Sequence, residues 1–208
     1  IIAIFAVSLL FIFAWLGADW ATRFQYVVMA LLVSALFSFF AGGLARWEMA
    51  TLAQNWAAPS EGPGLWIIFA IFFPAVTGFT QGVSMSGDLK NPGRSLPMGT
   101  FMAVGISILV YFGAALVFAG VLSNEILMKD YGAMKRVARF SVLIDAGVVA
   151  ATLSSAMASF LGAPRILQSL AKDRIFPFLL SFAKGYGPTE NPRRGVLLSS
   201  AIALATIS

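Results

Sequence analysis

The sequence predicts an all-α protein, a polytopic membrane helical bundle, and three observations indicate this fold class. First, 59% of the 208 residues are hydrophobic, only 11% are charged, and the mean hydropathy is +0.87. Soluble domains carry roughly 25% charged residues because their surface needs them. Second, apolar runs long enough for a helix to cross a bilayer core recur along the chain. Third, short loops carrying most of the basic residues separate these runs, as membrane orientation requires. We therefore expect an integral, multi-pass membrane protein.

The composition also excludes whole classes of function. The chain has no cysteine and no histidine, which removes disulfides, thiolate metal sites, cysteine nucleophiles and the commonest general base. No phosphate-binding loop or calcium-binding loop is present either. We therefore expect a protein that is not an enzyme, has no catalytic residues, uses no cofactor and holds no resident metal. The net charge of +5 lies in the loops and is explained by membrane orientation rather than by binding of nucleic acid.

The apolar runs divide residues 1–208 into spans of one transmembrane domain. Because the chain begins and ends inside apolar runs, we interpret it as a piece of a longer protein. The predicted elements are a partial span at 1–17, spans at 24–43, 65–83, 96–122 and 140–162, and a partial span at 195–208.

The span at 65–83 contains helix-breaking residues deep in an apolar segment. Pro74 lacks a backbone N–H, and Gly78 and Gly82 each lower helix propensity by about 1 kcal/mol. Unwound backbone at membrane depth is tolerated where it lines protein or a water-filled cavity, and transporters place substrates and ions at such breaks. The alternative is a proline-kinked packing helix in which Thr77 bonds back to a carbonyl of its own helix.

The span at 140–162 carries a stripe of small and hydroxyl-bearing residues. The carbonyl of Ala151 and the hydroxyls of Ser154 and Ser155 lie on one helical face, where they offer neutral oxygens to a small hard cation. Small residues and serines are also common where membrane helices pack closely, so packing is the alternative interpretation.

Two blocks of motifs resemble the cation-chloride cotransporters of the amino acid-polyamine-organocation superfamily. The first block is Phe72-Phe73-Pro74-Ala75-x-Thr77-Gly78, with Ser86-Gly87-Asp88-Leu89 and Leu96-Pro97-x-Gly99-Thr100. The second is Ala151-Thr152-Leu153-Ser154-Ser155-Ala156-x-Ala158-Ser159, with Ala163-Pro164-Arg165, and the segments Phe182-Ala183-Lys184-Gly185-Tyr186-Gly187 and Asn191-Pro192-Arg193-Arg194-Gly195 are most similar to the sodium-coupled branch. The resemblance implies a fragment of a LeuT-like inverted-repeat transporter, running from helix four to the start of helix nine.

The resemblance also implies site residues, each by its position in this sequence. It assigns sodium to Ala151, Ser154 and Ser155, potassium to Pro74 and Thr77, and chloride to the amides of Gly78, Phe79 and Thr80. The implied function is electroneutral sodium-coupled chloride symport by alternating access, in the plasma membrane, with potassium as a further ion. Sodium, chloride, potassium and membrane lipid are the expected partners, and the full-length protein could form a homodimer. Two alternatives stay open: an amino-acid or polyamine permease of the same fold, and a non-transporting membrane scaffold.

Overall fold

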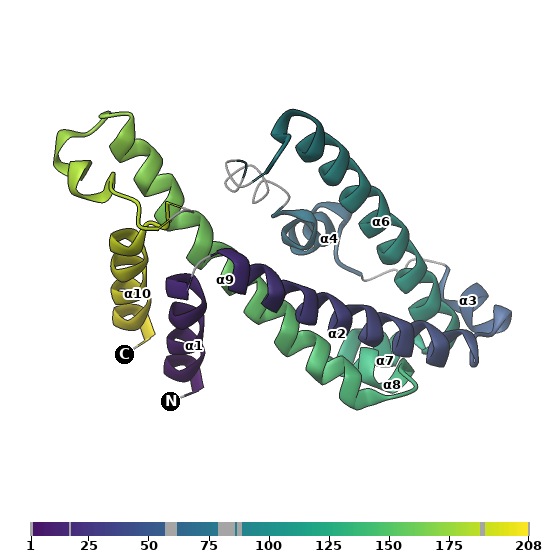
Figure 1. Cartoon of the computed structure of the whole chain (residues 1–208). Helices are drawn as coiled ribbons and strands as arrows, with labels where there is room; N and C mark the ends of the chain where they lie inside the picture. The colour runs from purple at the N-terminus through teal and green to yellow at the C-terminus, as the bar shows by residue number, and fades with distance from the viewer. Residues whose placement is uncertain are drawn as a thin grey trace. The chain divides into compact units, whose positions relative to one another are not determined.

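A computed structural model of the chain describes residues 2–16, 18–56, 62–78, 86, 89–187 and 190–207 (Figure 1). The chain divides into two compact units, and helices α2 and α9 contribute to both. Unit 1 comprises Ile1–Ala30, Val83–Asp88 and Val149–Ser208. Unit 2 comprises Leu31–Gly82 and Leu89–Val148.

All regular elements of the described residues are helices, so the all-α prediction is confirmed. The α-helices are α1 Ile2–Leu16, α2 Ala18–Leu44, α3 Met49–Asn55, α4 Leu65–Phe72, α6 Pro92–Val121, α7 Asn124–Lys129, α8 Ala133–Val137, α9 Ser141–Lys172 and α10 Arg193–Ile207. The 3₁₀ helices are η1 Phe73–Val76 and η3 Pro177–Phe182.

Three of these helices are long and apolar enough to cross a membrane: Trp20–Leu44 in α2, Pro92–Val121 in α6 and Ser141–Lys172 in α9. At 1.5 Å per residue, about 20 residues cover the hydrocarbon core, and each of the three exceeds that length. Helix α1 and the α4–η1 segment are shorter apolar helices. These helices give the chain a multi-pass membrane architecture.

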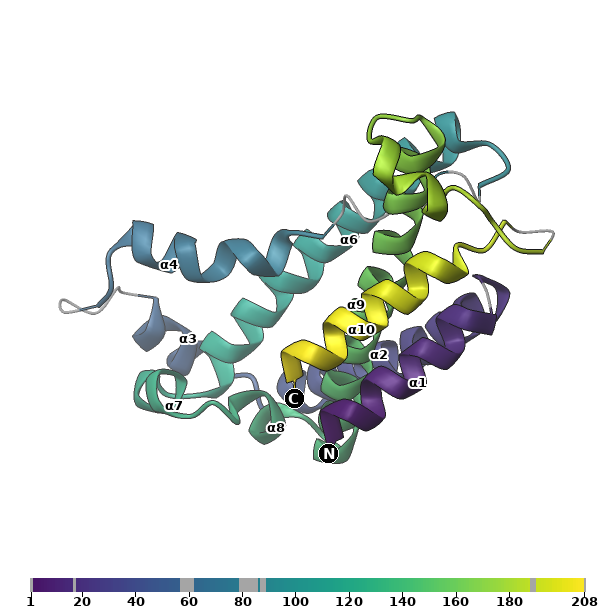
Figure 2. The ribbon, with the colours of Figure 1, turned by 90° about the vertical axis from the view of Figure 1, so that its left-hand side faces the viewer.

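In unit 1, helices α1 and α10 lie antiparallel and side by side (Figure 2). The buried core that they share with α2 and α9 consists of Leu10, Ala14, Ala21, Met157, Leu161 and Val196. Gly195 allows α10 to approach α9 closely, because a Cβ atom on this residue would lie only 2.9 Å from the Cβ of Pro164.

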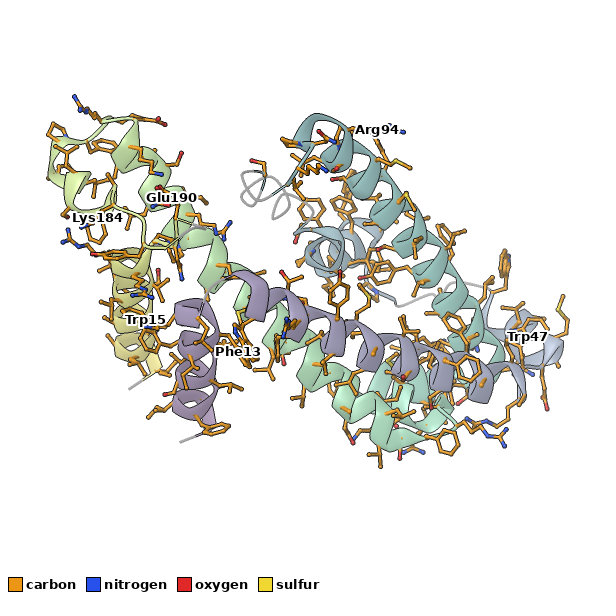
Figure 3. All side chains as sticks on the ribbon, in the orientation of Figure 1. Phe13, Trp15, Trp47, Arg94, Lys184 and Glu190 are labelled. Carbon is orange, nitrogen blue, oxygen red and sulfur yellow. The ribbon has the colours of Figure 1, made fainter. Side chains whose placement is uncertain are left out.

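The segment before α10 caps the end of α1. Asn191 donates from Nδ2 to the carbonyls of Ala14 and Trp15, both at 3.2 Å. These carbonyls lie in the last helical turn, where no helical partner is available. The guanidinium of Arg193 lies 5.1 Å from the centre of the Trp15 ring, which is labelled in Figure 3. The start of α10 is thus anchored on α1.

Unit 2 has its own aromatic core around Phe39, which is fully buried. The rings of Phe40 and Phe118 lie 5.3 Å and 5.0 Å from that of Phe39, measured between ring centres. Beside it, the buried Ser38 hydroxyl accepts a hydrogen bond from the Phe140 N–H at 2.8 Å and donates to the Phe140 carbonyl at 3.1 Å. This hydroxyl ties α2 to the start of α9.

The polar segments between the long helices contain short helices that the sequence did not predict. Helix α3 lies between α2 and α4, and its Asn55 donates to the Ala119 and Leu122 carbonyls at 2.8 and 2.7 Å. The indole of Trp47, labelled in Figure 3, donates to the Leu116 carbonyl at 3.1 Å. The two Asn55 bonds satisfy carbonyls at the end of α6 that helical bonding leaves open, and the Trp47 bond goes to a carbonyl within the helix. A short polar segment thus gains helical structure from its contacts with a longer helix.

Candidate functional site

The α-helix formed by the apolar residues after Gly64 ends early. Helix α4 stops at Phe72, the next four residues form the 3₁₀ helix η1, and Thr77 has extended backbone with φ −87° and ψ 174°. Pro74 explains the change, because it has no N–H to donate to a carbonyl one turn earlier. Gly78 then has φ +99°, a backbone conformation that residues with a Cβ atom rarely adopt.

The two residues predicted to bind potassium lie together at this end of η1. The Pro74 carbonyl accepts the Thr77 backbone N–H at 3.3 Å and the Thr77 hydroxyl at 2.8 Å. The hydroxyl uses its hydrogen in this bond, so the lone pairs of Thr77 Oγ1 stay available to a cation. The carbonyl, in contrast, has two lone pairs and two protein donors. Thr77 therefore offers an oxygen more readily than Pro74 does.

Tyr111 is a functional candidate that the sequence reasoning missed. Its hydroxyl, on α6, donates to the Ala75 carbonyl at 2.8 Å, and its ring packs edge-on against Phe72 with 5.2 Å between ring centres. The bond satisfies a carbonyl beside the point where helical hydrogen bonding stops. A tyrosine hydroxyl inside an apolar run is the sequence signal that could have indicated it.

A cavity of about 660 Å³ lies between η1 and α6 within unit 2. Its lining is mostly apolar, with the hydroxyls of Thr77, Thr100, Ser107 and Tyr111 as polar groups. The predicted potassium ligand Thr77 therefore faces a space rather than packed protein. Of the predicted chloride ligands, Gly78 follows at the exposed end of this segment, whereas Phe79 and Thr80 lie outside the described residues.

The predicted sodium ligands lie in unit 1, on a helix that is continuous through their positions. Helix α9 runs from Ser141 to Lys172, so the Ala151 carbonyl keeps its place in the helical hydrogen-bond ladder. Ser154 is half-buried and Ser155 is exposed. All three residues lie on one side of the helix, because they are spaced by three and four positions.

Ser154 is bonded to a residue that the sequence reasoning did not identify. Its hydroxyl donates to Oε1 of Gln25 on α2 at 2.6 Å, and Nε2 of Gln25 lies 3.5 Å from the Ser154 carbonyl oxygen. Both residues belong to unit 1. An amide inside the apolar span at 24–43 was the available signal, since polar side chains in a span need a polar partner.

The ion pairs of the described residues lie at the ends of the long helices or in the segments between them. Lys129 pairs with Glu125 at 2.9 Å, Lys135 with Asp145 at 2.6 Å and Lys172 with Glu190 at 2.5 Å, and Arg136 pairs with Asp130. The pKa of Asp130 is lowered, chiefly because the Gly132 N–H donates to this carboxylate. The predicted ligand positions are built instead from hydroxyls, carbonyls and amides. Such uncharged groups can replace the hydration of an ion without holding it permanently.

Comparisons with known proteins identify the family. The model of the family described as "Amino acid permease" matches residues 1–207. Solute carrier family 12 member 2 of Danio rerio is 33% identical over 92% of this chain and 21% of its own length. Member 1 of Mus musculus is 33% identical over 92% of this chain and 22% of its own length. Member 8 of the same species is 32% identical over 92% of this chain and 28% of its own length.

These matches confirm the predicted resemblance at the level of the family. The relatives belong to solute carrier family 12, the cation-chloride cotransporters, within the amino acid permease family. The match is thus to a family of transporters and not of enzymes. The chain spans between a fifth and three tenths of the length of these relatives.

Proposed function

Because the chain belongs to the amino acid permease family and matches members of solute carrier family 12, we propose that the natural protein that carries it is a sodium-coupled chloride symporter. Sodium and chloride move together by electroneutral alternating access, with potassium as a third ion whose transport the Thr77 variants described below test. Membrane lipid surrounds the protein in the plasma membrane, and the residues 1–208 form one transmembrane domain. The complete protein would pair as a homodimer.

The observation that carries the sodium part of this proposal is the pair of hydroxyls on α9. Ser154 and Ser155 stand one turn after Ala151 on a helix that stays intact. A small cation loses its hydration only where oxygens replace water, and two hydroxyls with a carbonyl supply half of a six-oxygen shell. Ser155 is exposed on α9, so its hydroxyl is accessible to an ion.

The chloride part depends on the end of η1. After a helix break, the N–H groups of the next segment point along the chain axis without helical acceptors, and an anion can take their place. Gly78 has the positive φ that turns the backbone at this point. We assign chloride to the amides of Gly78, Phe79 and Thr80, and potassium to the Pro74 carbonyl and Thr77.

An amino-acid or polyamine permease is the second candidate, and the description of the matching family model favours it. Such a protein would bind a substrate carboxylate at the amides that we assign to chloride. Uptake of radiolabelled chloride and of labelled amino acids into vesicles separates the two. Saturable amino-acid uptake without chloride uptake would contradict the symport proposal.

Replacing Ser155 with alanine tests sodium binding directly. Loss of one ligand oxygen should cost roughly 1.5–3 kcal/mol, the value of a hydrogen bond to a charged group. The sodium concentration for half-maximal chloride uptake should therefore rise about ten- to hundredfold. The measurement is radiolabelled chloride uptake at varied sodium in the complete protein.

The matched control is Ser8→Ala, because the Ser8 hydroxyl bonds within its own helix, to the Ile4 carbonyl at 2.8 Å. This variant should keep the sodium dependence of the parent. If the sodium curve of Ser155→Ala also overlays that of the parent at normal expression, the serines serve helix packing. The sodium-coupled proposal would then lose its main support.

A further inference from the structure

We infer that Gln25 of α2 is a positioning residue of the proposed sodium site, because it holds the Ser154 hydroxyl with its lone pairs free for the cation. This inference rests on the proposed function and adds a residue from a second helix. It begins from the 2.6 Å bond between Ser154 Oγ and Gln25 Oε1.

Several serine hydroxyls elsewhere in these helices bond back to their own helix. Ser8 donates to the Ile4 carbonyl at 2.8 Å, and Ser200 donates to the Val196 carbonyl at 2.7 Å. Ser159 does the same with the Ser155 carbonyl at 3.3 Å. Through this back-bonding, a hydroxyl inside an apolar helix is satisfied without a polar group from another helix. Ser154 departs from this pattern, as the Ser38 hydroxyl of α2 does, because its hydrogen goes to a different segment of the chain.

The direction of this hydrogen determines what the hydroxyl can bind. A hydroxyl has one donor and two acceptor lone pairs, and only the lone pairs can bind a cation. An acceptor that takes the hydrogen therefore leaves the lone pairs for the ion. Oε1 of Gln25 is such an acceptor for Ser154. Partners behind the ligands of a metal ion act in the same way, because they fix the orientation of each ligand.

The surroundings of Gln25 fix its position along α2. Ala21 and Val28, one turn before and after it on the same face, are 1% and 3% exposed. On α9, Ala150 and Met157 flank Ser154 in the same way and are 4% and 0% exposed. Buried neighbours on both helices set the register in which the amide meets the hydroxyl. A long polar side chain in a membrane span is costly unless it is paired, and this register supplies the partner.

The second end of the amide supports the same role. Nε2 of Gln25 lies 3.5 Å from the Ser154 carbonyl oxygen, so both polar ends of the side chain are directed at one residue. Turning the Gln25 amide away would lose its contact with the Ser154 hydroxyl. The side chain therefore restrains the rotamer of Ser154 as well as the direction of its hydrogen.

The test uses the complete protein and measures chloride uptake as a function of sodium. Gln25→Met keeps the length of the side chain and removes the acceptor. The sodium concentration for half-maximal uptake should rise about tenfold, as is typical when a partner behind a metal ligand is lost. Gln25→Glu restores an acceptor and adds a negative charge, so its half-saturating sodium concentration should equal or fall below that of the parent. The chloride concentration for half-maximal uptake should stay unchanged in Gln25→Met at saturating sodium.

A double variant separates positioning from packing. Ser154→Ala combined with Gln25→Met should have the sodium dependence of Ser154→Ala alone, because two groups that act through one bond are not additive. Gln54→Met makes the same change at an exposed position of α3 and serves as the control. Its sodium dependence of chloride uptake should equal that of the parent. If Gln25→Met does not reach the membrane, Gln25→Asn, which is too short to reach Ser154, should show the same sodium shift.

The outcomes distinguish this inference from the proposed function. If Ser155→Ala shifts the sodium curve but neither Gln25→Met nor Gln25→Asn does, the role of Gln25 is wrong and the sodium site stands. Additive shifts in the double variant, or a failure of Gln25→Glu to restore sodium affinity, would also overturn the role of Gln25. If Ser155→Ala leaves the sodium curve unchanged, the proposed sodium site itself fails.

Discussion

Two regions of the chain present oxygens in opposite ways. One is the serine stripe of α9, which consists of Ala151, Ser154 and Ser155, and the other is the η1 segment after α4. Helix α9 keeps its backbone hydrogen bonds through Ala151–Ser155, so its side-chain hydroxyls are added to the second lone pair of the Ala151 carbonyl. At η1 the α-helical bonds end, and backbone carbonyls become acceptors for side chains, Pro74 for Thr77 and Ala75 for Tyr111. In an intact membrane helix, the side chains therefore decide which oxygens can bind an ion. In a broken helix, the backbone conformation decides it.

The two regions also differ in how they are held. Ser154 is tied to a second helix by a side chain, Gln25, whose flanking residues are buried. The η1 segment is exposed and is tied by Tyr111 to the exposed face of α6. If the difference is functional, substitutions in the stripe should alter the affinity for one ion. Substitutions that alter the backbone at the break, as at Gly78, should instead disturb more than one ion.

The largest effect is expected at Gly78, because its positive φ sets the direction of the backbone at the end of this segment. Gly78→Ala adds a Cβ at φ +99°, which costs about 1–2 kcal/mol in left-handed backbone, and Gly78→Val adds a branched side chain as well. We expect chloride uptake to fall by at least about tenfold in Gly78→Ala, as a strain above 1.4 kcal/mol would produce. Gly78→Val should abolish most of it. The measurement is radiolabelled chloride uptake, normalised to protein at the membrane.

A matched control isolates conformation from crowding. A Cβ on Gly78 or on Gly105 of α6 would meet no described atom within 4 Å, and of the two only Gly78 has positive φ. Gly105→Ala should therefore keep normal uptake, and alanine even favours its helix by about 1 kcal/mol. Equal uptake in Gly78→Ala and Gly105→Ala would mean that the backbone at Gly78 does not matter for chloride, and the comparison above would fail.

A smaller effect is expected from removing the Thr77 hydroxyl at the end of η1. Thr77→Val keeps the shape of the side chain and removes Oγ1, whereas Thr77→Ser keeps the oxygen. If potassium binds there, the potassium concentration for half-maximal uptake should rise about tenfold in Thr77→Val, at the lower end of the cost of losing a bond to a charged group. Thr77→Ser should stay near the parent. Rubidium uptake measures this, with potassium as the competitor.

The same pair of variants shows which region binds which ion. In Thr77→Val the sodium dependence should stay that of the parent, because the serine stripe is unchanged. A shift in sodium with no shift in potassium would contradict the assignment of Thr77. Shifts in both would show that the break affects sodium binding as well.

Much of the fold followed from local sequence, and the contacts between elements did not. Apolar runs predicted the long helices, and Pro74 with Gly78 predicted where α4 loses its helical bonds. Helix α9 continues to Lys172 through Pro164, because one missing N–H is tolerated in a helix that packs closely against α10. The bond between Gln25 and Ser154 joins residues 129 positions apart, and it depends on the register of two helices, which periodicity within one helix cannot give.

The smallest effect is expected at Tyr111, whose hydroxyl supports the break from outside. Tyr111→Phe removes the 2.8 Å bond to the Ala75 carbonyl and keeps the edge-on contact with Phe72. A neutral hydrogen bond contributes about 1 kcal/mol, so the half-saturating chloride concentration should rise by no more than about fivefold. Tyr131→Phe is the control, since Tyr131 is fully exposed in the segment between α7 and α8. A Tyr111→Phe variant as impaired as Gly78→Val would mean that α6, rather than the Gly78 backbone, sets the conformation of the break. The chloride site would then depend on side-chain contacts, as the serine stripe does, and the contrast between the two regions would disappear.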